Sequence, residues 1–156
     1  MIQQYHTKEQ ALQKAKHYCA YQERCHKEVK DKLYDLGLHK NEVEEALADL
    51  IQENYLNEER FAIHFAGGRF RVKQWGRVKI KYELKQKQVS TFCINKALRE
   101  IDDAAYIATL HKLLAEKLKT LSKEKNIFIK KKKAQDFLLQ RGFESDLIRE
   151  AIEKSI

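Results

Sequence analysis

Apolar residues recur three and four positions apart along most of the chain, which is the spacing of one buried face on an α-helix. The clearest ladder, at positions i, i+3, i+4, i+7 and i+8, consists of Val43, Ala46, Leu47, Leu50 and Ile51. Stripes of the same kind occupy residues 11–19, 61–70 and 106–121. Proline is absent and only 5 of the 156 residues are glycine, so little in the sequence interrupts helices. The pattern therefore predicts an all-α fold.

One longer pattern occurs three times, at residues 33–47, 84–98 and 138–152. Its apolar positions are Leu33, Leu38 and Val43 in the first copy, Leu84, Val89 and Ile94 in the second, and Leu138, Phe143 and Ile148 in the third. An apolar stripe precedes each copy, and the copy begins in a short second helix. The third helix that follows within the copy completes a three-helix unit. The repeat predicts three tandem three-helix repeats, at residues 1–56, 57–101 and 102–156. A short turn before the last helix makes each repeat helix-turn-helix-like, a geometry that does not by itself establish DNA binding.

Turn and cap residues mark where the helices of each repeat should end and begin. Gly37 and Gly142 follow the second helix of the first and third copies, where a left-handed residue is least costly as glycine. Gln88 stands at the same place in the middle copy. The expected helix starts are marked by Thr7 with Gln10, Asn41 with Glu44, and Asn57.

The net charge of +8 is unevenly spread over the three repeats. Residues 1–56 hold 8 basic and 10 acidic side chains (−2), residues 57–101 hold 11 and 4 (+7), and residues 102–156 hold 12 and 9 (+3). A basic middle indicates a polyanionic or acidic-surfaced partner. The alternative is that the charge serves solubility alone.

Many of these cations cluster around the first and second helices of the middle repeat and at the matching place in the third. The candidate partner-binding or nucleic-acid-binding residues are Arg69, Arg71, Lys73, Arg77, Lys79, Lys81, Lys85, Lys131, Lys132 and Lys133. Cations at a helix N-terminus oppose the helix dipole, so stability alone would favour acidic residues there. An anionic partner, which a helix N-terminus also attracts, would account for them. Trp75 could stack on a base, although a single tryptophan at a helix junction is more often a core residue.

Other kinds of chemistry find little support. Gly67 and Gly68 lie inside a helical pattern without a preceding strand, so they fit a close helix approach or a bend better than a phosphate loop. Cys19, Cys25 and His26 lack the spacing of a zinc site, and no base is positioned for a cysteine nucleophile. We therefore expect no catalytic residues, no metal and no cofactor.

The sequence also indicates where the chain works. It has no N-terminal run resembling a signal peptide and no apolar stretch of 18 residues that could span a membrane. Its three cysteines fit packed, reduced thiols. We expect a cytoplasmic protein that does not bind membranes.

Three stretches resemble the RecX family of bacterial regulators of the RecA recombinase. They are "ERCHKEVKDKLYDLGL" (23–38), "QENYLNEERFA" (52–62) and "WGRVKIKYEL" (75–84), and the resemblance extends over about residues 8–154. It implies an elongated, curved arrangement of the three repeats that binds along the groove of a RecA–DNA filament. It also implies inhibition of ATP hydrolysis, strand exchange and coprotease activity, and hence a role in recombination, DNA repair and the SOS response. Within the quoted stretches, the expected core residues are Tyr55, Leu56, Phe61 and Ile80.

Two other functions remain open at this point. The chain could be a free-standing helix-turn-helix DNA-binding protein or transcription factor, although third helices such as "EVEEALADLIQEN" are acidic. It could also be an adaptor with no nucleic-acid role. The resemblance favours a non-enzymatic monomer whose partners are the RecA filament and the phosphates of single-stranded or double-stranded DNA.

Overall fold

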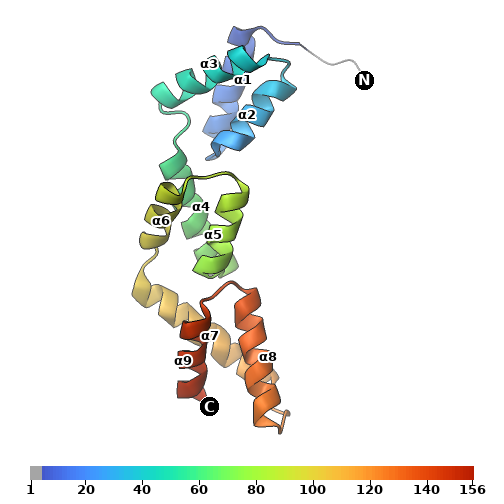
Figure 1. Cartoon of the computed structure of the whole chain (residues 1–156), viewed down its shortest axis with the longest axis vertical. Coiled ribbons are helices and arrows are strands. Elements are labelled where there is room, and N and C mark those ends of the chain that lie inside the picture. Colours follow the sequence, from blue (N-terminus) through green and yellow to red (C-terminus); the bar gives the residue numbers. More distant parts are fainter. Residues whose placement is uncertain (1–4) are drawn as a thin grey trace. The chain divides into compact units, whose positions relative to one another are not determined.

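The computed structural model describes residues 5–156, which contain nine α-helices and no strand (Figure 1). The helices are α1 (Lys8–Tyr21), α2 (His26–Asp35), α3 (Lys40–Gln52), α4 (Glu58–Lys73), α5 (Arg77–Gln86), α6 (Thr91–Arg99), α7 (Asp103–Thr120), α8 (Ile127–Gln140) and α9 (Ser145–Ser155). The predicted all-α fold is confirmed.

Six of the nine helices in residues 5–156 pack in two sets of three. Helices α1, α2 and α3 all contact one another, and so do α7, α8 and α9. By their contacts the described residues form two compact units, of which the first runs to Phe65 and resumes over Leu84–Lys96. The second unit consists of Ala66–Glu83 and Ala97–Ile156. The boundaries of the three repeats and their elongated, curved arrangement stay predictions.

Helix starts follow local capping chemistry. The Thr7 hydroxyl accepts from the Gln10 backbone N–H at 3.1 Å while the Thr7 N–H donates to the Gln10 side chain at 3.0 Å, which confirms the predicted capping box. Asn57 also caps as predicted, since its side-chain oxygen accepts from the Arg60 N–H at 2.9 Å. The predicted start at Asn41 with Glu44 is wrong. Helix α3 begins at Lys40, because the preceding N–H of His39 is already bonded to Glu42 at 3.2 Å.

A left-handed residue follows the second helix of each set. The φ angles are 95° at Gly37, 94° at Gly142 and 61° at Gln88. The predicted turn position is therefore confirmed in all three copies. The middle copy forms the same turn with a side chain that must tolerate the left-handed region, where glycine would be less strained.

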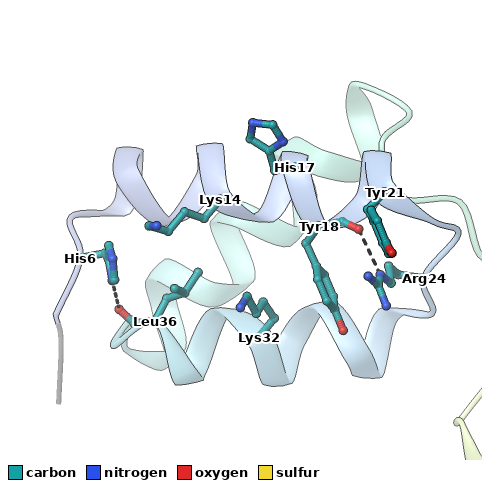
Figure 2. A pocket seen from close by; sticks show the side chains of 8 residues that line it. All are labelled: His6, Lys14, His17, Tyr18, Tyr21, Arg24, Lys32 and Leu36. Carbon is teal, nitrogen blue, oxygen red and sulfur yellow. Dashed lines mark hydrogen bonds between the residues drawn. The ribbon is translucent and has the colours of Figure 1, made fainter.

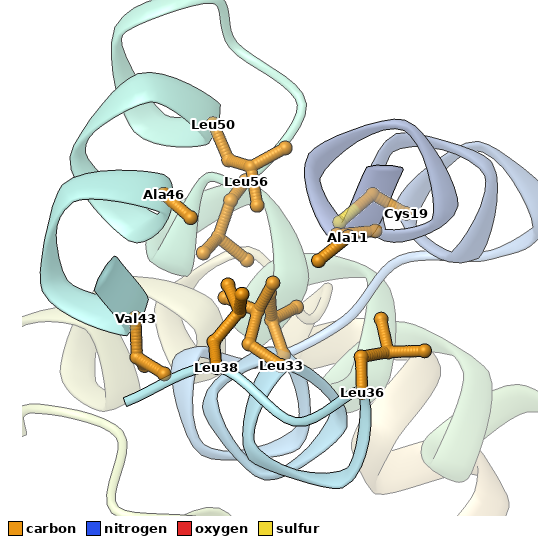
Figure 3. Close-up of a cluster of buried hydrophobic side chains, with 11 residues drawn as sticks. Ala11, Cys19, Leu33, Leu36, Leu38, Val43, Ala46, Leu50 and Leu56 are labelled. Carbon is orange, nitrogen blue, oxygen red and sulfur yellow. The ribbon is translucent and has the colours of Figure 1, made fainter. Parts of the chain in front are cut away.

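The core of α1–α3 is built from one face of each helix (Figure 3). Val43, Ala46 and Leu50 of the predicted ladder are fully buried, but Ile51 is 46% exposed. Leu47 packs against the same core and is partly buried, so the buried stripe of α3 is narrower than the sequence pattern only at Ile51. The prediction of Tyr55 as a core residue is also wrong, because this residue is 38% exposed and its ring centroid lies 5.4 Å from the ammonium of Lys16. Leu56, Phe61 and Ile80 are buried as predicted.

In the second unit, the backbone of the turn after α8 lies against the backbone that begins α5. The Gly76 N–H donates to the Arg141 carbonyl at 2.8 Å, and the Val78 N–H donates to the Gly142 carbonyl at 2.9 Å. A Cβ atom at Gly76 would overlap the Gly142 carbonyl, and one at Gly142 would overlap Lys79. Only glycine allows this contact at either position.

The close approach predicted at Gly67 and Gly68 is wrong, and Gly76 is where it occurs. A Cβ at Gly68 would meet nothing within 4 Å, and the three atoms nearest to one at Gly67 belong to the guanidinium of Arg71 in the same helix. Both residues therefore lie in a continuous α4 without a backbone neighbour that requires glycine.

A buried tyrosine joins the starts of three helices in the second unit. Tyr106 is fully buried; its hydroxyl donates to Glu144 and accepts from the Arg77 backbone N–H at 3.0 Å. The Arg77 guanidinium pairs with Glu144 at 2.9 Å and with Asp103 at 2.8 Å. Burial, reinforced by the hydrogen bond to Glu144, raises the pKa of Tyr106, so the phenol stays protonated and keeps donating.

The two kinds of glycine should respond to alanine with opposite signs. We expect Gly76→Ala or Gly142→Ala to lower the free energy of unfolding by more than about 1 kcal/mol, because the added Cβ overlaps backbone or strains a left-handed residue. Gly68→Ala, the matched control, should raise it by about 0.5–1 kcal/mol, since the site is open and helical. Urea unfolding measures all three, and a destabilising Gly68→Ala or a neutral Gly76→Ala would contradict the packing described.

Removing the Tyr106 hydroxyl should destabilise the chain without changing its shape. We expect Tyr106→Phe to cost about 1–3 kcal/mol of unfolding free energy, because the Arg77 N–H and a Glu144 oxygen each lose a buried partner. Tyr82→Phe makes the same chemical change at an exposed site of α5 and should stay within about 0.5 kcal/mol of the parent. Equal effects of the two changes on the urea midpoint would show that the hydrogen bonds of Tyr106 contribute nothing.

Candidate functional site

The predicted cations lie on three helices. They are Arg69, Arg71 and Lys73 at the end of α4, Arg77, Lys79, Lys81 and Lys85 on α5, and Lys131, Lys132 and Lys133 on α8. All belong to the second unit except Lys85, which falls in the first.

Three of these cations already have carboxylate partners within the chain. Arg77 pairs with Glu144 and Asp103, so the helix-start cation that suggested an external anion is neutralised by two acidic residues of its own unit. Lys132 pairs with Asp136 at 2.8 Å, and Lys133 lies 3.9 Å from Glu124. A role for these three in partner binding stays a prediction.

A second group of cations lies around the ring of Trp75. It lies between α4 and α5, where the Lys79 ammonium is 4.4 Å and the Arg69 guanidinium 5.5 Å from its ring centroid. Trp75 is partly buried, so it belongs neither to the fully buried core nor to the fully exposed surface. Its environment is a small surface pocket of about 230 Å³ that it shares with Lys79, Phe137 and Arg141. Both cations lie over the ring, so a base that stacks there would lie beside them or take the place of one of them.

Arg141 extends this cluster from the other side. Its guanidinium donates to the Lys73 carbonyl at 2.9 Å and lies 5.4 Å from the Phe137 ring. We call Arg69, Lys73, Trp75, Lys79 and Arg141 the basic Trp75 surface. Sequence reasoning missed Arg141, although it precedes the turn residue Gly142. Its position depends on the contact between Gly142 and Gly76, which no pattern within one repeat reveals.

The other predicted cations lie apart from any carboxylate. Arg71, Lys73, Lys81 and Lys131 form no ion pair with the described residues of the second unit, and the same holds for Lys85 in the first. Arg71, Lys73 and Lys85 are exposed, whereas Lys81 and Lys131 are partly buried. An unpaired cation can bind phosphate or carboxylate groups without first breaking an internal ion pair. The structure thus separates the predicted set into paired, tryptophan-associated and unpaired side chains.

The cysteines are buried and free, as predicted for packed thiols. Burial raises the pKa of Cys25 to about 11, so its nucleophilic thiolate is scarce at neutral pH. Residues 5–156 contain no cluster of three or more His, Cys, Asp or Glu that could hold a metal ion. In the same range no helix is long and apolar enough to cross a membrane.

Curated relatives match most of the chain. A regulatory protein RecX from Prosthecochloris aestuarii is 34% identical over 92% of this chain and 92% of its own length. The regulatory protein RecX of Chlorobium phaeobacteroides is 33% identical over 85% of this chain and 84% of its own length. Against the RecX of Bacillus cytotoxicus, at 27% identity, the match covers 88% of this chain but only 50% of the relative.

Solved structures share the fold. The crystal structure of RecX from Lactobacillus salivarius matches with a TM-score of 0.85 at 26% identity and covers 94% of this chain and 95% of that one. A second crystal structure of a regulatory protein RecX matches with a TM-score of 0.84 over 94% of this chain and 71% of that one. At 20% identity the second likeness supports the fold alone.

Family models match the chain three times in succession. The RecX first three-helix domain matches residues 11–50, the second matches residues 57–98 and the third matches residues 104–152. Together the matches include all three copies of the sequence repeat and follow their order. The chain belongs to the RecX family of bacterial regulatory proteins, with all three of the family's three-helix domains present.

Proposed function

We propose that this chain is a non-catalytic, cytoplasmic regulator that binds the RecA–DNA filament as a monomer and inhibits RecA. Membership of the RecX family supports the class of function. The observation that carries the proposal to particular residues is the basic Trp75 surface, which lies mainly in the repeat with a net charge of +7. Inhibition would extend to ATP turnover, strand exchange and coprotease activity.

The chemistry of the basic Trp75 surface suits a filament that carries a nucleic acid. Lys73, Lys79 and Arg141 can neutralise phosphates, and displacement of counterions from the nucleic acid would make that binding strongly salt-dependent. RecA carboxylates could meet the same cations. Trp75 adds a ring face on which an unstacked base could lie, with Arg69 and Lys79 beside it.

A free-standing helix-turn-helix DNA-binding protein is not favoured. Helix α3, the third of the first set, carries Glu42, Glu44, Glu45 and Asp49 against Lys40. Four carboxylates on one short helix would repel the phosphates that border a major groove. Family membership adds no support for that alternative.

The proposal is tested by titrating the chain into RecA bound to single-stranded DNA. We expect ATP turnover to fall as the chain is added and to stay low at saturation, because the bound regulator prevents the filament from cycling. A rate of hydrolysis that is unchanged at saturating chain would overturn the proposal.

Charge reversal tests the basic Trp75 surface itself. We expect Lys73→Glu with Lys79→Glu to raise the concentration for half-inhibition about tenfold or more, since attraction becomes like-charge repulsion. Lys73 ends α4 and Lys79 lies in the first turn of α5, so the effects on the two helix dipoles oppose each other.

The matched control is Lys112→Glu with Arg149→Glu, on exposed faces of α7 and α9. It makes the same change in net charge and should leave the half-inhibition concentration within about twofold if position matters rather than total charge. Equal loss in both double variants would assign the effect to net charge and remove the role given to the basic Trp75 surface.

A further inference from the structure

A second basic surface lies in the first unit, between α1 and α2. It is an open groove of about 600 Å³ into which Lys14 and Tyr18 of α1, and Lys32 of α2, extend (Figure 2). Tyr21 and Arg24 line its end near the α1–α2 connection. We call these five residues the α1–α2 groove. No carboxylate lines it, although residues 1–56 have a net charge of −2.

The positive charge of the groove results from how the other lysines of this repeat are paired. Lys8 lies 2.7 Å from Glu45, Lys16 lies 2.9 Å from Glu53, and Lys27 lies 3.1 Å from Asp31. The carboxylates of these pairs lie on α3, directly after α3 and on α2, and none of the three lines the groove. Lys14 and Lys32 form no ion pair with residues 5–156, so the groove keeps two lysine charges that no carboxylate in this range pairs with.

Arg24 has a different part in the groove. Its guanidinium stacks 3.7 Å from the Tyr18 ring centroid and donates to the Tyr18 carbonyl at 3.0 Å. It also pairs with Glu28, whose carboxylate is 3.8 Å away. Arg24 is therefore held in place by Tyr18 and Glu28, and the unpaired charges of the groove are those of Lys14 and of Lys32, whose ammonium lies 5.6 Å from the centroid of the Tyr18 ring.

Tyr21 supplies an exposed ring beside these cations. Its side chain is 83% exposed, and the Arg24 guanidinium lies 6.0 Å from its centroid. Tyr18 is already covered by Arg24, so Tyr21 is the ring with a free face. A ring of this size contributes nothing to the core in that position, but it offers a platform on which a planar ligand can stack.

We propose that the α1–α2 groove binds a segment of single-stranded nucleic acid, with phosphates at Lys14 and Lys32 and an unstacked base on Tyr21. Cations along a groove together with an exposed aromatic ring are the two features that single-strand binding uses. An acidic peptide would need the cations but not the ring. This inference goes beyond the proposed function because it requires no RecA and lies in the other unit from the basic Trp75 surface.

The test measures anisotropy of a labelled oligothymidylate of about 20 nucleotides titrated with the full chain, without RecA, at several salt concentrations. We expect Lys14→Gln with Lys32→Gln to weaken binding about tenfold at low salt. It should also reduce the slope of log affinity against log salt by about 1.4, or about 0.7 for each lost phosphate contact. Lys30→Gln with Lys40→Gln, at exposed lysines outside the groove, is the matched control and should change neither quantity.

A ring substitution separates base stacking from charge. Tyr21→Ala should weaken oligothymidylate binding about tenfold and leave the salt slope unchanged, whereas Tyr34→Ala, outside the groove on α2, should have no effect. Unchanged binding by Tyr21→Ala, or displacement of the oligonucleotide by polyglutamate at equal affinity, would overturn the proposal in favour of an acidic peptide. Because RecA is absent from this titration, its failure leaves the proposed inhibition of RecA untouched, and the reverse also holds.

Discussion

The backbone contact between Gly76 and Gly142 is the constraint on which the basic Trp75 surface depends. It brings the turn after α8 against the first residues of α5, so Arg141 reaches the carbonyl at the end of α4 while Lys79 and Trp75 face it from the start of α5. A side chain at either glycine would separate the two backbones. The cations would then remain in the sequence, but they would no longer form one surface, because they come from α4, from α5 and from the turn after α8.

The same region shows why a cation near a helix start does not by itself indicate a ligand. Arg77 opposes the dipole of α5, yet it faces Glu144, which precedes α9, and Asp103, which begins α7. Each acidic residue interacts favourably with the positive end of its own helix dipole and also neutralises Arg77. The unfavourable position of Arg77 at the start of α5 is thus offset by its two ion pairs with acidic residues at the starts of α7 and α9. Lys79 has no such partner among the described carboxylates, and its ammonium lies over the Trp75 ring instead.

Features that depend on local spacing could be predicted from the sequence. The helices, the left-handed residues after each second helix, and the caps at Thr7 and Asn57 all follow from residues a few positions apart. Features that depend on which faces meet could not. The exposure of Ile51 reflects how much of α3 its two neighbours cover, and the partial burial of Trp75 reflects the pocket that it shares with residues of α5 and α8. Arg141 entered the candidate site only through a contact between distant turns.

The distribution of carboxylates, rather than of cations, decides where this chain can bind an anion. In the first repeat the acidic residues outnumber the basic ones, yet the α1–α2 groove is positive, because Glu45, Glu53 and Asp31 are engaged with lysines that lie elsewhere. In the third repeat a run of lysines looks more basic than it is, since Asp136 and Glu124 neutralise part of it. The net charge of a segment therefore does not show that the α1–α2 groove is positive or that the lysine run of the third repeat is partly neutralised. An anionic partner responds to charges that the fold leaves unpaired, and Lys14 and Lys32 in the α1–α2 groove and Lys79 beside Trp75 combine such a charge with a nearby aromatic ring.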